Sequence, residues 1–234
     1  MMTDGKKICA ISVLLMALLS QAPSVFAVTL WDWGFNINGS AFNPGDTVPA
    51  LDAGGFDWSK GLGALTFSFK PGTAGHFYLL SFFDHETGFW DDEFATAAGA
   101  PGAGQSWEID EPGYVFGDIY GHFRDGILEN TNAVDVNSPD DVSMAMGWDF
   151  GLLQGQWAVI TLLLGEERPA GFYLSQTDPD SDYTFYFSGA IDIRGEVGPA
   201  AVPEPGTIFY TMAGVIAFSG FRDRRFMIRR YWNT

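Results

Sequence analysis

Cysteine is almost missing from this sequence, because the 234 residues contain only one, Cys9. A single thiol excludes a disulfide scaffold and a zinc ribbon, which both need several cysteines. Basic residues are also scarce: 12 lysines and arginines stand against 29 acidic residues, for a net charge of −17. Phosphate backbones repel so acidic a protein, so we expect no nucleic-acid partner.

Apolar bulk, in contrast, is plentiful. The sequence has 21 Phe, 8 Trp and 8 Tyr, and 47% of its residues are hydrophobic. Glycine and proline number 29 and 12, a smaller share than low-complexity chains have. The length suits one domain or at most two small ones. The sequence therefore predicts a folded protein with a core, not an intrinsically disordered one.

The N-terminus has the pattern of a secretory signal peptide. Two lysines precede an apolar run, residues 8–19, which is short for a membrane span. Val25 and Ala27 then occupy the −3 and −1 positions that signal peptidase reads. We therefore assign residues 1–27 to a signal peptide that is cut after Ala27. A retained N-terminal anchor or a buried helix is the alternative.

The C-terminus has a second targeting pattern. Pro203, Glu204 and Pro205 precede an uncharged run, residues 207–221, and a cluster of arginines follows: Arg222, Arg224, Arg225, Arg229 and Arg230. The run is marginal for a bilayer, but snorkelling arginines extend its reach, so we predict a transmembrane helix over 207–221. The positive-inside rule places the basic tail, residues 226–234, in the cytoplasm. A C-terminal core element with a basic tail is the alternative.

Residues 202–225 resemble the PEP-CTERM sorting signal, which combines Pro-Glu-Pro, a short apolar helix and an arginine cluster. The resemblance implies that Pro203, Glu204 and Pro205 are recognised by an exosortase, an integral-membrane cysteine protease of bacteria that make exopolysaccharide. It further implies an inner-membrane-anchored precursor that is cut and released to the cell surface or extracellular matrix. Such a signal directs the sorting of the protein and specifies no biochemical activity. Residues 142–173 are also similar to the C-terminal half of many exoproteins of this kind.

The exported segment, residues 28–201, has the periodicity of β-strands. Apolar and polar residues alternate over three segments: 65–69, 142–150 and 183–194. Two others are more continuously apolar, as central strands are: 76–83 and 157–164. Turn signals separate these segments, and repeats of a β-propeller are missing. We therefore predict an all-β fold: a two-sheet β-sandwich, jelly-roll or immunoglobulin-like, flanked by an N-terminal signal helix and a C-terminal transmembrane sorting helix.

Negative charge dominates the exported segment, which has five basic and 26 acidic residues. Such a surface attracts cations, and it repels anionic polysaccharide unless divalent ions bridge the two. Asp178, Asp180 and Asp182 stand at i, i+2 and i+4 in a predicted loop, and alternating carboxylates can supply three of the oxygens that Ca²⁺ takes. We predict a Ca²⁺ site at these three residues. A solvated acidic turn is the alternative.

Catalytic motifs are missing, while polar clusters are present. Residues 84–93 form the densest cluster, a candidate for a second cation site or for the carboxylate pair of a glycoside hydrolase. The exported segment has no cysteine nucleophile, no G-x-S-x-G elbow and no metal-ligating histidine motif. We expect Trp31 and Trp33 in a core strand; stacking on a sugar is the alternative.

The sequence therefore predicts a non-enzymatic exported protein of the cell surface or extracellular matrix, with calcium and extracellular polysaccharide as its candidate ligands. The alternative is a secreted carbohydrate-active enzyme on a jelly-roll scaffold.

Overall fold

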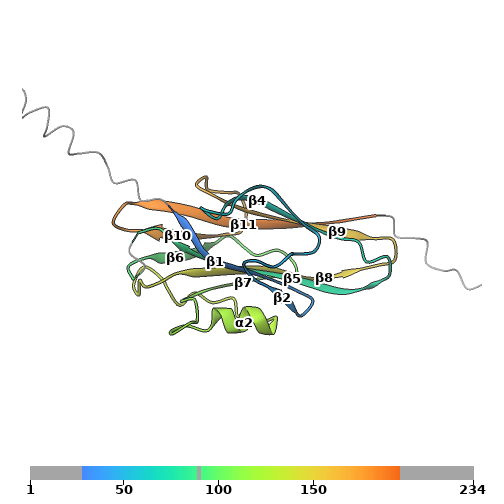
Figure 1. Cartoon of the computed structure of the whole chain (residues 1–234), viewed down its shortest axis with the longest axis horizontal. Helices are drawn as coiled ribbons and strands as arrows, with labels where there is room; N and C mark the ends of the chain where they lie inside the picture. Colours follow the sequence, from blue (N-terminus) through green and yellow to red (C-terminus); the bar gives the residue numbers. More distant parts are fainter. Residues whose placement is uncertain (1–27, 89–90, 196–234) are drawn as a thin grey trace, which may run out of the picture.

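The computed structural model describes residues 28–88 and 91–195 (Figure 1). The predicted signal peptide, sorting signal, transmembrane helix and basic tail lie outside these residues. The described elements are β1 (Thr29–Ile37), β2 (Ser40–Phe42), β3 (Leu51–Asp57), β4 (Leu62–Phe69), β5 (Gly75–Glu86), β6 (Phe94–Ala98), β7 (Gln105–Asp110), α2 (Ile119–Asp125), β8 (Ser143–Leu152), β9 (Trp157–Gly165), β10 (Tyr173–Asp178) and β11 (Tyr183–Arg194). Within the described part, no helix is long and apolar enough to cross a membrane.

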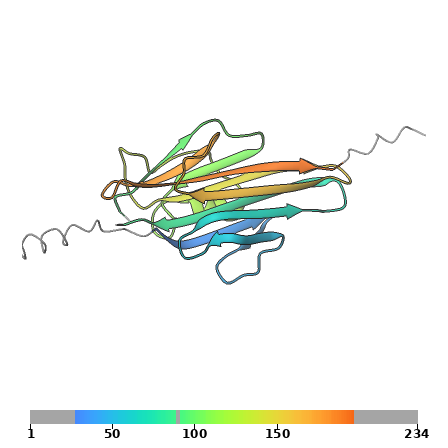
Figure 2. The same cartoon turned by 90° about the horizontal axis from the view of Figure 1, so that it is seen from above.

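The strands form two antiparallel sheets that pack face to face (Figures 1 and 2). One sheet has five strands in the order β2-β1-β5-β8-β7, and the other has six in the order β3-β4-β9-β11-β10-β6. The prediction of an all-β fold with two sheets is confirmed for the described residues. Helix α2 is an element that the strand periodicity did not predict.

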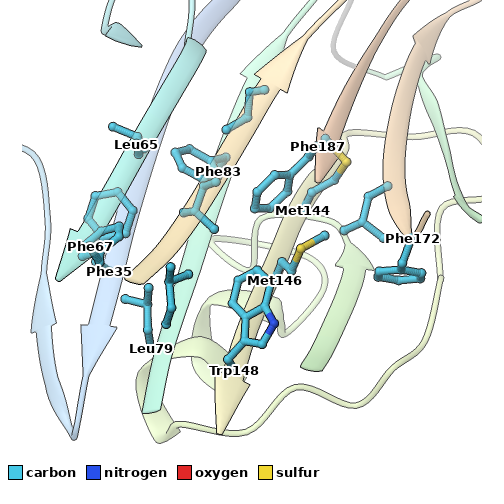
Figure 3. Close-up of a cluster of buried hydrophobic side chains, with 14 of the residues drawn as sticks. Phe35, Leu65, Phe67, Leu79, Phe83, Met144, Met146, Trp148, Phe172 and Phe187 are labelled. Atoms are coloured by element: carbon cyan, nitrogen blue, oxygen red, sulfur yellow. The ribbon is translucent and has the colours of Figure 1, made fainter. Parts of the chain in front are cut away.

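Large apolar side chains from the inner faces of both sheets fill the space between them (Figure 3). In β8, Met144, Met146 and Trp148 belong to this core, as the period of two predicts. Phe83 of β5 meets Phe187 of β11 across the gap, with ring centroids 5.3 Å apart and the rings edge to face. Each predicted alternating segment therefore buries one face against the opposite sheet.

Helix α2 covers part of the outer face of the five-stranded sheet (Figure 1). Its Ile119 and Phe123 are fully buried and pack against Phe82 of β5. Gly34 of β1 makes the close approach feasible, because a Cβ at this position would lie 2.7 Å from the Phe123 ring. This sheet is thus apolar on both faces wherever the helix lies over it.

The chain changes sheets at five connections between the described strands, and two of these connections match each other. The connection from β4 to β5 and the connection from β8 to β9 both change sheets, and β4 pairs with β9 while β5 pairs with β8. Because the strands of the five-stranded sheet pair antiparallel, β5 and β7 end where β1 and β8 begin. Polar side chains from all four strands meet at this end of the sheet.

Candidate functional site

A row of polar residues crosses four adjacent strands at this end of the five-stranded sheet. The register pairs Asp84 of β5 with Asp32 of β1 on one side and with Ser143 of β8 on the other, and Ser143 pairs with Asp110 of β7. Directly paired residues project from the same face of a sheet. We call Asp32, Asp84, Ser143 and Asp110 the polar row.

The polar row lies on the outer face, beyond the end of helix α2. The neighbouring row, which includes Phe82 and Ala145, packs under the helix. The segment between β7 and α2 is bonded to both ends of the polar row. The Tyr114 hydroxyl donates to Asp32, and the Asp118 backbone N–H donates to Asp110 at 2.9 Å. Asp84 and Ser143, in the middle of the row, are almost completely buried.

Three carboxylates gather around the middle of the polar row. Asp84, Glu86 and Asp141 each place a carboxylate oxygen within 4.8 Å of the others, and we call them the carboxylate cluster. Asp84 is 1% exposed, whereas Glu86 and Asp141 are half-buried. Asp84 Oδ1, Asp141 Oδ1 and Ser143 Oγ are buried oxygen atoms without a hydrogen-bond partner. Buried polar groups are normally paired, so this arrangement is unusual.

The electrostatics of the carboxylate cluster are unfavourable for three negative charges. Burial, together with the charge of Asp141, raises the pKa of Asp84 to about 8. Burial and the charge of Glu86 raise the pKa of Asp141 to about 7, and burial also raises the pKa of Glu86. The neighbouring Ser143 side chain acts in the other direction and lowers the Asp84 pKa, although its Oγ has no partner in hydrogen-bonding geometry.

Among residues 28–88 and 91–195, no basic side chain forms an ion pair with this cluster. The ion pairs of the described residues involve His76, His122 and Arg194, and none of them reaches Asp84, Glu86 or Asp141 (the partners are Asp149, Glu108, Asp118, Glu129 and Asp192). The carboxylates must therefore hold protons or a cation, or else remain uncompensated.

The loop predicted to bind Ca²⁺ has a different geometry. Asp178 is 1% exposed, and its carboxylate accepts the Asp180 N–H at 2.9 Å and the Ser181 hydroxyl at 2.6 Å. Asp182 adopts a left-handed backbone conformation with φ of 54°. The carboxylates of Asp178, Asp180 and Asp182 are not among the described groups that come within 4.8 Å of one another. The loop is thus a turn closed by Asp178, and calcium binding there stays a prediction.

A second group of potential ligands, Glu108, Asp118 and His122, is already satisfied internally. His122 Nδ1 lies 2.8 Å from Glu108 and 3.4 Å from Asp118. The hydrogen bond to Glu108 raises the pKa of His122 and favours the imidazolium ion. This pairing fixes α2 on β7, and both carboxylate oxygens of the buried Glu108 accept hydrogen bonds, one from His122 and one from the Glu129 N–H.

Two further buried polar residues come from the predicted 84–93 cluster. His85 points into the core against Phe185, with ring centroids 4.6 Å apart, and burial lowers its pKa to about 4. Glu93 is fully buried; it accepts the Thr87 N–H at 2.8 Å, the Thr87 hydroxyl and the Gln176 amide, and burial raises its pKa to about 8. The polar segment 84–93 is therefore divided: Asp84 and Glu86 lie on the outer face, whereas His85 and Glu93 lie in the interior.

The N-terminal tryptophans and the cavity lie outside the carboxylate cluster. Trp31 is 70% exposed, contrary to our expectation, while Trp33 packs between Phe35 and Trp58 as expected. A cavity of about 230 Å³ lies on the outer face of the other sheet, and its lining residues are Leu163, Gly165, Glu166, Glu167, Pro169, Tyr186 and Ser188. The cavity and the carboxylate cluster are therefore on different sheets.

Comparison with known proteins yields no assignment: no protein-family model matches the chain, and neither the curated proteins nor the solved structures show a significant match to it.

Proposed function

We propose that this chain is a non-enzymatic exported protein of the cell surface or extracellular matrix, sorted through a C-terminal PEP-CTERM signal. In this proposal, signal peptidase removes residues 1–27. Residues 207–221 then hold the precursor in the inner membrane, and an exosortase recognises Pro203-Glu204-Pro205 and cuts nearby. The observation that carries the proposal is the Pro-Glu-Pro, apolar run and arginine cluster placed after a complete β domain.

Both cuts are compatible with the described fold. Strand β1 begins at Thr29, and Val28 packs into the core with 5% exposure. Strand β11 ends at Arg194, ahead of Pro203. Removal of residues 1–27 and of the segment after about Gly206 therefore leaves every described strand intact. The released domain would keep its full core.

The matched crossovers support a jelly-roll type of sandwich as the finer topology. In a jelly-roll, a long double-stranded ribbon is wound over two sheets. The β4–β5 and β8–β9 segments form such a ribbon, because β4 pairs with β9 in one sheet and β5 with β8 in the other. The proposed domain thus offers to the extracellular medium the outer face of the six-stranded sheet and the part of the five-stranded sheet that α2 leaves uncovered.

Exopolysaccharide is the proposed partner of the exported domain. Exposed aromatic rings offer flat apolar faces that stack on sugar rings, and Trp31 and Phe116 are 70% and 68% exposed. The negative charge of the domain favours a neutral polymer or one bridged by divalent cations.

A secreted carbohydrate-active enzyme on a jelly-roll scaffold is the second candidate. One observation favours it: the oxygens of Asp84, Glu86 and Asp141 lie within 4.8 Å of one another, near the carboxyl separation of retaining glycosidases. The burial of Asp84 and the position of the cavity on the other sheet both weigh against it. A sugar substrate would have to reach Asp84 for this candidate to hold.

The sorting proposal is tested by intact-mass spectrometry of the full chain produced in a host with an exosortase and in the same host without one. We expect released protein that begins at Val28 and ends near Gly206, formed only when the exosortase is present. Pro203→Ala/Pro205→Ala should leave the precursor in the membrane, whereas Pro101→Ala, in the exposed loop between β6 and β7, should be processed normally. Released protein that still ends at Thr234 would refute the proposal.

A further inference from the structure

We propose that Asp84, Glu86 and Asp141 bind one Ca²⁺ ion on the outer face of the five-stranded sheet, with the hydroxyl of Ser143 as a fourth oxygen ligand. This site differs from the loop of Asp178, Asp180 and Asp182. The proposal does not depend on how the protein is sorted.

The three carboxylates converge from distant parts of the chain. Asp84 and Glu86 stand two residues apart near the end of β5, so both project from the outer face. Asp141 comes from the segment just before β8, which pairs with β5. Their oxygens lie within 4.8 Å of one another, close enough to share one cation. Three like charges this close destabilise a fold unless protons or a counter-ion neutralise them, and a divalent cation can bind all three carboxylates at once.

The hydroxyl oxygen of Ser143, a neutral side chain beside the carboxylates, is also unpartnered. Ser143 is fully buried, and its Oγ has no hydrogen-bond partner. Ser143 is paired directly with Asp84 in the sheet register, so its side chain projects from the same face toward the carboxylate cluster. A hydroxyl buried in this way needs a partner, and a cation held by Asp84 would supply it.

The ligand chemistry selects Ca²⁺ among divalent cations. All the converging atoms are oxygens, which are the ligands of hard cations. The nearest histidine in sequence, His85, points to the opposite face and contacts the Gly61 carbonyl at 3.1 Å, so nitrogen ligation of zinc is not available from it. Ca²⁺ accepts six to eight oxygens in irregular geometry, whereas Mg²⁺ needs a near-ideal octahedron. Glu86 and Asp141 are half-buried, which leaves access for the ion and for water ligands.

The test uses the full-length chain, purified in a mild non-ionic detergent and stripped with a chelator. At a hundredfold excess of Ca²⁺ over its Kd, we expect the melting temperature to rise by about 5–10 °C. Isothermal titration calorimetry should show one ion per chain. Mg²⁺ at the same concentration should produce a clearly smaller shift.

Isosteric variants locate the ion. Asp84→Asn and Asp141→Asn should lose the Ca²⁺-dependent shift and the calorimetric signal. Asp84→Asn should also melt higher than the wild type in chelator, since it replaces a carboxyl group whose ionised form burial disfavours. A higher melting temperature would show that the variant is folded. Asp149→Asn, an exposed carboxylate on the same face of β8, is the matched control and should keep the full response.

Three results would overturn the proposal. The first is a wild-type protein that shows no Ca²⁺-dependent shift, which would mean that the carboxylates are held as protonated groups. The second is an unchanged response in both Asp84→Asn and Asp141→Asn. The third is loss of the response in Asp180→Asn alone, which would place the ion in the β10–β11 loop.

Discussion

Substitution of the buried Glu93 by glutamine should change how the stability of the domain depends on pH. Glu93 has no exposed surface, and burial raises its pKa to about 8, with a further contribution from the charge of Glu86. Because the folded pKa lies above the unfolded value of 4.5, the protonated form stabilises the fold. That stabilisation is complete below pH 4.5 and is lost as the pH rises through about 8.

The size of the effect follows from the difference between the two pKa values. Between pH 5 and pH 8, the Glu93 contribution should lower the free energy of unfolding by about 3 kcal/mol. Glu93→Gln removes this dependence. In the wild type the Gln176 amide donates to a carboxylate oxygen of Glu93. In the variant, one orientation of the new side-chain amide would place its NH₂ group against the NH₂ group of Gln176, so that two donors oppose each other. That mismatch costs about 1 kcal/mol at every pH. The variant should therefore be slightly less stable than the wild type at pH 5 and more stable at pH 8.

Melting curves of the full-length chain in chelator, collected from pH 5 to pH 8, measure this crossover. The wild-type melting temperature should fall by roughly 6–12 °C relative to the variant across this range. Glu167→Gln, at an exposed position, controls for the loss of one charge and should follow the wild-type curve. Parallel curves for the wild type and Glu93→Gln would refute the reasoning, because they would show that Glu93 titrates with its ordinary pKa.

Three further outcomes can be measured on the same protein. The negative charge of the domain should make its melting temperature rise between low and moderate NaCl, and a flat or falling profile would contradict this. Phe123→Ala should destabilise the protein by about 3–5 kcal/mol in urea unfolding, because it removes the ring that packs α2 against the sheet and leaves a cavity. Arg124→Ala, at the neighbouring exposed position, should change the stability little. Gly147→Ala should lower the urea midpoint strongly, because its Cβ would meet the Leu79 carbonyl oxygen at 2.5 Å; Gly151→Ala, with its nearest neighbour at 4.0 Å, should be mild.

The sequence predicted the strands well where a strand buries one face. Residues 183–194 alternate because Phe185 and Phe187 face the core while Tyr186 faces outward, and they form β11 as predicted. Helix α2 was not predicted because it has only seven residues, and two of them, Ile119 and Phe123, make its apolar contact. So short a helix is stabilised by its contacts with the sheet, and its own periodicity is too brief to detect.

The carboxylate cluster was predicted only in part. Asp84 and Glu86 belong to the dense polar segment that the sequence singled out, but Asp141 and Ser143 join them through the pairing of β5 with β8. A single sequence does not encode that register in any local pattern. The available signal was weak: Asp140 and Asp141 stand directly before a strongly alternating strand. The loop of Asp178, in contrast, had the expected spacing, yet the turn uses its first carboxylate to bind its own backbone and Ser181.

The matched crossovers also set the order in which the chain can fold. The central pairs join distant positions: Phe69 pairs with Ala158, and Gly75 pairs with Leu152. Closing such long loops costs entropy before any core contact forms, and folds dominated by non-local pairing fold slowly. Strands β1–β7 therefore have no complete core until β8 and β9 are available. In the export that we propose, with the N-terminus passing first, this delay would keep the chain unfolded until nearly all of the domain has crossed the membrane.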